Sequence, residues 1–369
     1  MVYLDYSATT KVLPEALDTY NKVSTEYFAN PNSMHSLGLK SKKLIDASLK
    51  KISSLLNIRE DEITFTSGAT EANNTAIKGI CNKYKNRGNH IITTPLEHSS
   101  IIEPLNFLKE EGFTFDYVPL DENGRVNINA LDEMITDRTV LVSINSVSSE
   151  LGIREPLEEI SRVVRKHKKC FLHCDITQSI GKEHINFSLF DLASFSSQKF
   201  FGPRGIGVLY IKKGINITPL LHGGKSTNSL RSGTPNTPLI ASMTKSLGIV
   251  LENLDKNYEY ILNLNKYLVK RLEKLDVTIN SNKYSIPHIV NFSLHGIKSE
   301  TMVHALEADE IYVSTTTACN TNNYSESVYR LTNDLERARN TIRVSISYQT
   351  TKEEIDYFIE KLKLYIDTL

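Results

Sequence analysis

A lysine and an aspartate stand where two strand-like runs end, and together they suit pyridoxal 5'-phosphate (PLP) chemistry. Lys199 follows the run 191–197 and precedes the glycine-rich turn 202–205, and Asp175 follows the apolar run 170–174. A lysine amine condenses with the cofactor aldehyde, and a carboxylate keeps the pyridine nitrogen protonated so that the ring withdraws electrons. A solvated surface lysine and a helix-capping aspartate are the ordinary alternatives. The pairing predicts an enzyme whose chemistry begins at a substrate's α-carbon.

A phosphate site is indicated on the same predicted sheet. Ala69 and Thr70 open a helical pattern directly after a strand-like run and a glycine. A helix N-terminus offers unpaired N–H groups and a positive dipole end, although an ordinary helix cap has the same sequence. Ser196 and Gln198 point the same way on an extended chain, so both could reach the phosphate while the neighbouring lysine takes the aldehyde.

Two further polar side chains follow predicted strands. His98 comes after the strand-like run 90–94, where an imidazole could stack on a flat cofactor ring and move protons near neutral pH. A surface residue that caps the next helix is the alternative. Gln178 lies three residues after the candidate aspartate and could donate to the phenolic oxygen of the ring.

A cysteine and an arginine near the C-terminus could act on a substrate. Cys319 lies in a polar loop, where exposure makes a nucleophilic thiolate plausible. Arg343 interrupts an apolar strand pattern and could bind a substrate carboxylate as a bidentate fork, with a structural ion pair as the equal alternative. The glycine-rich segment 222–234 is either an ordered anion-binding loop or a flexible surface loop. The other cysteines are predicted to be packing residues, namely Cys81, Cys170 and Cys174.

The bulk composition excludes several classes of protein. The 369 residues suggest two domains, or one large domain with an appendage, and 40% of them are hydrophobic. Lys+Arg and Asp+Glu are equal at 43 each, which argues against a nucleic-acid partner. The four cysteines form no CxxC pair or zinc-type array, so we expect no metal site and a reduced, cytoplasmic setting. No signal peptide and no membrane-spanning run is visible.

Strand-like and helix-like segments alternate from residue 60 to residue 211, which predicts an α/β fold with a largely parallel sheet. Ligands of such sheets bind beyond the carboxyl ends of the strands. The candidate strands are 62–66, 90–94, 113–118, 139–144, 170–174, 192–197 and 205–211, and the helical patterns are 69–86, 99–111, 128–135 and 157–168.

After residue 237 the pattern predicts a smaller α/β domain packed on the larger one. It begins with one long helical pattern through residue 275. The later candidates are strands at 289–294, 311–314 and 341–347 and helices at 300–308 and 352–367.

These elements, in this order, resemble the PLP-dependent cysteine desulfurases of the NifS/IscS type, which belong to the class V aminotransferases of fold-type I. The resemblance spans nearly the whole chain. It rests on motifs at 3–10, 30–35, 66–71, 97–98, 175–179, 202–207 and 231–234.

The resemblance implies a large PLP-binding domain over 13–240, with a mainly parallel seven-stranded sheet. It implies a small domain made of 1–12 and 241–369 that carries the Cys319 loop. It also implies a homodimer with active sites near the subunit interface, L-cysteine or a related amino acid as substrate, and a persulfide on Cys319 that a sulfur-acceptor protein could receive.

The resemblance also assigns roles to single residues. Lys199 carries the cofactor, Asp175 pairs with the pyridinium, and His98 stacks on the ring. Arg343 and Asn30 bind the substrate. The phosphate is held by Thr70, Ser196, Gln198 and Thr234 of the partner subunit.

Three departures from the family pattern leave other activities open. Gln198 replaces a usual histidine before the lysine, and Ser149 replaces an asparagine expected near the ring oxygen or the substrate. Threonines occupy 315–317, where small Ser/Gly residues are usual, and stiffen the loop. A cysteine or selenocysteine lyase, an aminotransferase of the same fold, and an inactive binding paralogue are the alternatives.

Overall fold

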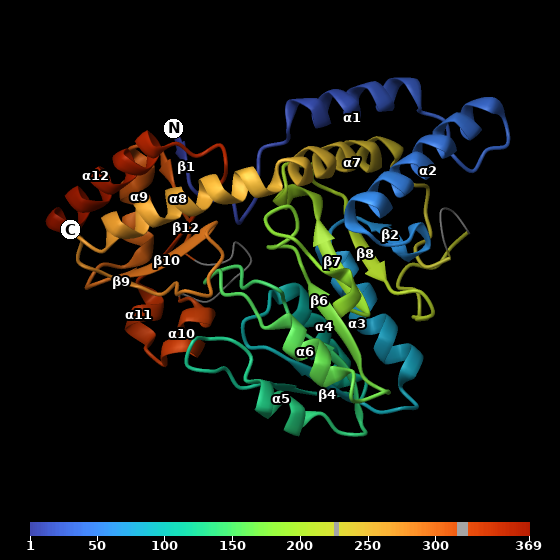
Figure 1. Cartoon of the computed structure of the whole chain (residues 1–369), viewed down its shortest axis with the longest axis horizontal. Coiled ribbons are helices and arrows are strands. Elements are labelled where there is room, and N and C mark those ends of the chain that lie inside the picture. The colour runs from blue at the N-terminus through green and yellow to red at the C-terminus, as the bar shows by residue number, and fades with distance from the viewer. Residues whose placement is uncertain (225–228, 316–323) are drawn as a thin grey trace.

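The computed structural model describes residues 1–224, 229–315 and 324–369. Within these ranges the strands form three sheets, and the two larger ones belong to two parts that lie side by side (Figure 1). Across the same ranges no helix is both long and apolar enough to cross a bilayer.

The largest sheet has seven strands in the order β2-β8-β7-β6-β5-β3-β4. Only β8 runs against its neighbours, β2 and β7, so the predicted α/β fold with a mainly parallel sheet is confirmed. The strands are β2 (Ile63–Thr66), β3 (His90–Thr93), β4 (Thr114–Tyr117), β5 (Thr139–Ser143), β6 (Phe171–Asp175), β7 (Leu192–Ser196) and β8 (Gly207–Ile211).

Both faces of this sheet are buried, because successive residues of a strand point to opposite sides. Ile91 packs into one hydrophobic cluster and Ile92 into the other, and Leu141 and Val142 divide in the same way. Helices α3 (Ala69–Tyr84) and α4 (Ser99–Glu110) cover one face. The other face is covered by α1 (Pro14–Glu26), α2 (Ser36–Leu56), α5 (Ile128–Met134), α6 (Leu157–Val164) and α7 (Thr237–Glu252).

The single long helix predicted over 237–275 is wrong. The chain forms α7 and then α8 (Leu254–Leu272), which are separated at Asn253, where φ is −108° and ψ is 13°. Helix α7 packs against α1 and α2, whereas α8 buries Leu264 and Leu268 in the core of the second part. One apolar stretch therefore contributes its first half, α7, to the core of the large sheet and its second half, α8, to the core of the second part.

The second part contains an antiparallel sheet in the order β12-β10-β9. Its strands are β9 (Val277–Ile279), β10 (Ile289–Leu294) and β12 (Thr341–Ser345), and its helices are α9 (Ser299–Ala308), α10 (Glu326–Thr332), α11 (Leu335–Arg339) and α12 (Lys352–Thr368). The N-terminal strand β1 (Val2–Tyr3) pairs in parallel with β11 (Ile311–Tyr312) of this part. The N-terminus thus crosses from the second part to the large sheet, and residues 5–10 pass the ends of β6 and β7 on the way.

Candidate active site

A cavity of about 240 Å³ lies at the carboxyl ends of the parallel strands. It brings together most of the residues predicted for the site, namely Ala69, Thr70, His98, Ser149, Asp175, Gln178, Ser196, Gln198, Lys199 and Arg343. Lining residues that the sequence did not reveal are Ser7, Ala8, Glu97, Ser100, Asn145, Val147 and Thr177. The described part of the chain holds no group of three or more His, Cys, Asp or Glu side chains arranged for a metal ion.

Lys199 enters the cavity from a short 3-10 turn, Ser197–Lys199, which follows β7 directly. Its ammonium donates to the carbonyl oxygens of Ser7 at 2.6 Å and Ala8 at 2.7 Å. The strand ends at Ser196, so the predicted strand alternation from Ser196 to Gln198 is wrong. Both side chains still line the cavity because the turn, and not an extended strand, directs Gln198 there.

Asp175 is held by two N–H donors. Its Oδ1 accepts from the backbone N–H of Thr177 at 2.9 Å, and its Oδ2 accepts from Asn73 Nδ2 at 2.8 Å. Asn73 lies on α3, is fully buried and also donates to Ser100 Oγ at 2.9 Å. This amide therefore fixes the orientation of the carboxylate. Sequence reasoning missed Asn73 because a polar residue inside a helical pattern carries no signal of what it faces.

The chain of contacts continues to His98, whose Nδ1 lies 2.9 Å from Ser100 Oγ. His98 also caps α4, since Nδ1 accepts the backbone N–H of Ser100 at 3.1 Å. The capping role weighed as an alternative is therefore real, and it coexists with a place in the cavity. Burial lowers the pKa of His98, the Asp175 charge opposes this and the Lys199 charge adds to it. The imidazole is neutral at pH 7, and because Nδ1 accepts, its proton is assigned to Nε2.

The N-terminus of α3 faces the same cavity. Ser196 Oγ accepts from the backbone N–H of Ala69 at 2.7 Å, which leaves the serine O–H as a donor. The backbones are in close contact here, because a Cβ on Gly207 would lie 2.5 Å from the Phe195 carbonyl oxygen and 2.7 Å from Gly68 Cα. Helix N–H groups, the Thr70 side chain and the Ser196 hydroxyl thus form a cup of donors that suits an anion.

Several polar atoms in the cavity wall have no hydrogen-bond partner among the described residues. They include Gln198 Oε1, Asn145 Oδ1 and Thr177 Oγ1, all of them buried. Interior polar groups are nearly always paired, so unpaired ones that line a cavity indicate a polar ligand. Glu97 also lines the cavity, and burial together with the Asp175 charge raises the pKa of its carboxyl well above the usual range. Burial thus favours the protonated form of Glu97, which can donate a hydrogen bond.

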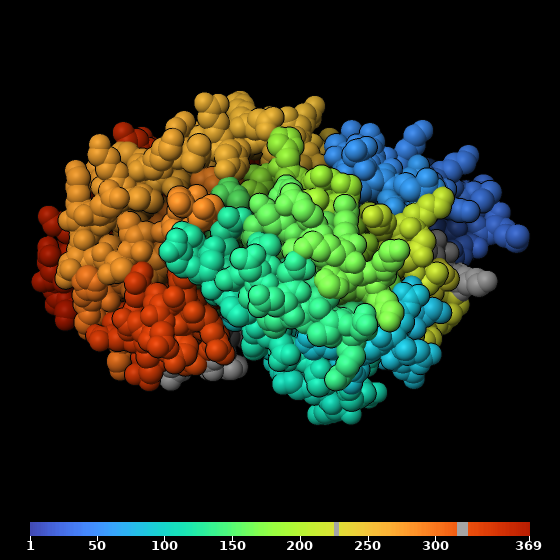
Figure 2. All heavy atoms as spheres, turned by 60° about the horizontal axis from the view of Figure 1, so that its bottom comes forward, coloured from blue at the N-terminus to red at the C-terminus, as the bar shows by residue number. Residues whose placement is uncertain are grey.

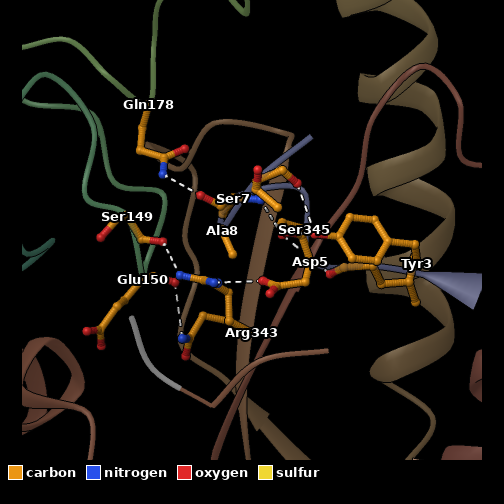
Figure 3. Close-up of polar contacts among 12 residues, drawn as sticks. Tyr3, Asp5, Ser7, Ala8, Ser149, Glu150, Gln178, Arg343 and Ser345 are labelled. Atoms are coloured by element: carbon orange, nitrogen blue, oxygen red, sulfur yellow. Dashed lines mark hydrogen bonds and ion pairs between the residues drawn. The ribbon is translucent and has the colours of Figure 1, made fainter. Parts of the chain in front are cut away.

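Arg343 on β12 is 1% exposed and lines the cavity. Its Nη2 forms an ion pair with Asp5 at 2.8 Å, and its Nη1 donates to the Ser149 carbonyl oxygen at 3.0 Å (Figure 3). The structural ion pair weighed as an alternative is therefore present. Two of the five guanidinium N–H groups are occupied by these contacts, which leaves donors for a substrate carboxylate.

Two predicted site residues lie outside the cavity of the single chain. Asn30 and Thr234 are both exposed, and Asn30 Oδ1 accepts the backbone N–H of Asn32 at 2.9 Å. Arg231, from the candidate anion-binding loop, forms an ion pair with Glu71 at 3.0 Å. In this chain its guanidinium is therefore paired with the carboxylate of a residue on α3.

Cys319 lies outside the described residues, as do Thr316 and Thr317. The chain on either side of them is described and is joined to the cavity wall. The backbone of Ser314 exchanges hydrogen bonds of 2.6 and 3.2 Å with that of Arg343, and the hydroxyl of Ser325 donates to the Glu150 carboxylate. Both ends of the segment that contains Cys319 are thus attached next to residues that line the cavity.

The chain belongs to the class V aminotransferase family, whose family model matches residues 2–358. The neighbouring positions of Lys199, Asp175 and the donor cup are in keeping with that membership.

Particular relatives share the whole length of the chain. A protein of Clostridium botulinum named cysteine desulfurase IscS is 39% identical over 98% of this chain and 93% of its own length. A NifS/IcsS protein homolog of Lactobacillus delbrueckii is 41% identical over 97% of this chain and 95% of its own length. A solved structure named NifS-like protein superimposes with a TM-score of 0.95 at 34% identity and covers 100% of both chains.

Proposed function

We propose that this protein is a PLP-dependent cysteine desulfurase that converts L-cysteine to L-alanine and leaves the sulfur as a persulfide on Cys319. The observation that carries the proposal is the cavity in which Lys199 and Asp175 lie at the ends of the adjacent strands β7 and β6. The full-length relatives named cysteine desulfurase favour this activity over others of the family.

The cavity fits PLP on its own chemistry. The cup formed by the α3 N-terminus, Thr70 and Ser196 would hold the phosphate. Asp175 would face the pyridine nitrogen, and His98 would lie against the ring. Bound PLP supplies an electron sink for cleavage at the α-carbon of an amino acid. The unpaired polar atoms of the wall are the remaining partners for such a polar ligand.

Lys199 is placed to move a proton at Nζ. The Ser7 and Ala8 carbonyl oxygens hold this amine in the cavity. As a free amine, Nζ would be the base that takes the α-proton of a substrate. The N–H groups of Asn73 and Thr177 keep the Asp175 carboxylate in one orientation.

The substrate carboxylate would bind the guanidinium donors of Arg343 that Asp5 and the Ser149 carbonyl leave free. This guanidinium lies in the cavity wall beside the attachment of the 316–323 segment.

The sulfur transfer is balanced without an external oxidant. The Cys319 thiolate attacks the substrate sulfur and forms an S–S bond, while the bond between that sulfur and the β-carbon breaks. The electron pair of the broken bond stays with the carbon product, which takes up protons as alanine. His98, neutral and protonated at Nε2, would supply one of them. A second thiol, from a reductant or an acceptor protein, then takes the outer sulfur.

We also propose that the protein is a cytoplasmic homodimer. A second copy would account for the two predicted site residues that lie outside the cavity. Asn30 and Thr234 are exposed on a single chain and would complete the site of a second copy. The segment around Asn30 also exposes Met34 at 94%, and α2 beside it exposes Leu37 and Leu39. In Figure 2 this blue segment forms the edge of the molecule opposite the red C-terminal helices. Apolar side chains at such exposure indicate a covered surface.

The test is a product analysis of the purified protein with PLP, L-cysteine and dithiothreitol. We expect alanine and sulfide in equal amounts, and we expect Cys319→Ser to bind PLP but release no sulfide. Pyruvate with ammonia would indicate a lyase, and a keto acid without sulfide an aminotransferase. Protein that stays colourless with added PLP would indicate an inactive binding paralogue.

A further inference from the structure

A buried lysine lies behind the candidate cavity, and none of the roles described above uses it. Lys182 is 7% exposed, and its Nζ donates to Gln178 Oε1 at 2.6 Å. Burial, together with the charges of Lys199 and Arg343, lowers the pKa of Lys182 to about 7, while Glu183 opposes them. Lysine is among the residues least often buried, so a buried one needs a reason.

The partner of Lys182 determines how Gln178 faces the cavity. In the observed contact Nζ donates to Oε1, so the Gln178 amide turns its oxygen toward Lys182 and its nitrogen away. Gln178 Nε2 then donates one N–H to the Ser7 carbonyl oxygen at 3.0 Å (Figure 3). Gln178 lines the cavity, and its second N–H is left to face a ligand there.

A small cavity lies beside Lys182. It measures about 20 Å³ and is lined by Lys182, Lys199 and His288, among others. This is enough room for about one water molecule. Burial, with the charges of Lys182 and Arg154, lowers the pKa of His288 well below its usual range, so this ring is neutral and adds no second cation beside Lys182.

We propose that Lys182 is a positioning residue for the cofactor. It holds and polarises the Gln178 amide so that Nε2 is presented as a donor to the ring oxygen of PLP. The inference rests on the proposed PLP function and deepens it. Without Lys182, Gln178 Oε1 is a buried acceptor with no donor, and the amide loses the contact that keeps its nitrogen turned toward the cavity.

A double-mutant cycle on PLP binding tests this dependence of one residue on the other. The variants are Gln178→Met, Lys182→Met and the double variant, with Lys245→Met on the exposed side of α7 as the control. The dissociation constant of PLP is measured on apo-protein by equilibrium dialysis. The pH midpoint of the cofactor absorbance is followed in parallel, and the thermal melting of each apo-protein reports on folding.

We expect both single variants and the double variant to bind PLP about fivefold more weakly than the wild type, the value of one ordinary hydrogen bond. The absorbance midpoint should move by the same amount in all three. Additive losses, about 25-fold in the double variant, would contradict the proposal. Wild-type protein that binds no PLP would overturn the proposed function instead.

Lys182→Gln is the second arm, because its amide keeps an N–H donor beside Gln178 while removing the charge. We expect its PLP dissociation constant to stay within about twofold of the wild type. If Lys182→Met does not fold, the PLP affinity of Lys182→Gln tests whether Lys182 acts on PLP binding through Gln178. A loss of affinity in Lys182→Gln that persists unchanged in the Gln178→Met background would contradict a role exerted through Gln178.

Discussion

Replacing Arg343 by methionine separates its two roles, the observed ion pair and the proposed contact with the substrate carboxylate. Methionine keeps the length and the packing of the aliphatic stem but provides no donor. The ion pair role affects stability, because Asp5 loses its cation. The side chain of Asp5 is 20% exposed and remains hydrated, so we expect a loss of only about 1–2 kcal/mol in the free energy of unfolding.

The substrate role affects binding of carboxylates alone. A charge-assisted hydrogen bond contributes about 1.5–3 kcal/mol, and a carboxylate fork makes two. Asp5 already neutralises part of the guanidinium charge, so we take about 2–3 kcal/mol for the pair together. At about 1.4 kcal/mol per factor of ten, this predicts a loss of affinity of roughly 30- to 150-fold for an amino acid.

L-Alanine and ethylamine differ only in the carboxylate and serve as matched ligands. Their dissociation constants are measured from the absorbance change of the PLP-loaded wild type and Arg343→Met. We expect the affinity for L-alanine to fall by the stated factor and that for ethylamine to change less than about twofold. Equal losses for both ligands would exclude a contact between Arg343 and the substrate carboxylate and leave Arg343 as a structural residue only.

Three further predictions concern other parts of the molecule. Burial raises the pKa of the thiols of Cys81 and Cys170 to about 12 and that of the Cys174 thiol well above its usual range. Iodoacetamide at pH 8 should therefore label one thiol of the native protein, Cys319, and all four thiols after denaturation. Rapid labelling of a second thiol in the native protein would contradict this prediction. Burial lowers the pKa of His173 to about 4 against 6.5 when unfolded, so the unfolded state binds the extra proton and stability falls by about 2 kcal/mol between pH 7 and pH 5. Urea unfolding of His173→Gln should show a smaller loss over that range, and an unchanged loss would count against it. Asn73→Leu should weaken PLP binding about tenfold in equilibrium dialysis, because Asp175 loses a donor, and wild-type affinity would exclude a role for this amide.

Most strands of the large sheet could be predicted from the sequence, because they are short apolar runs separated by helical patterns with clear ends. Helices α1 and α2 precede the first strand of the large sheet and were not predicted, although the buried residues of α2 recur at helical spacing. The sequence also suggested one helix where α7 and α8 meet at Asn253, because the helical periodicity continues across this break.

For the site, residues that follow strands could be predicted, because the fold gathers strand ends at one edge. Asn73 and Lys182 could not, since their roles depend on which side chains face them across the sheet and the turn. The outcome for Arg343 shows the same limit. A buried arginine requires a partner, but only the structure shows that Asp5, 338 residues away along the chain, supplies it.

The proposed function depends above all on Lys199, whose amine is expected to carry the cofactor. Purified protein incubated with PLP, reduced with sodium borohydride and digested should yield a peptide with a pyridoxyl group on Lys199, and Lys199→Ala should yield none. A pyridoxyl group found on another lysine, or on none, in protein that has bound PLP would contradict the account.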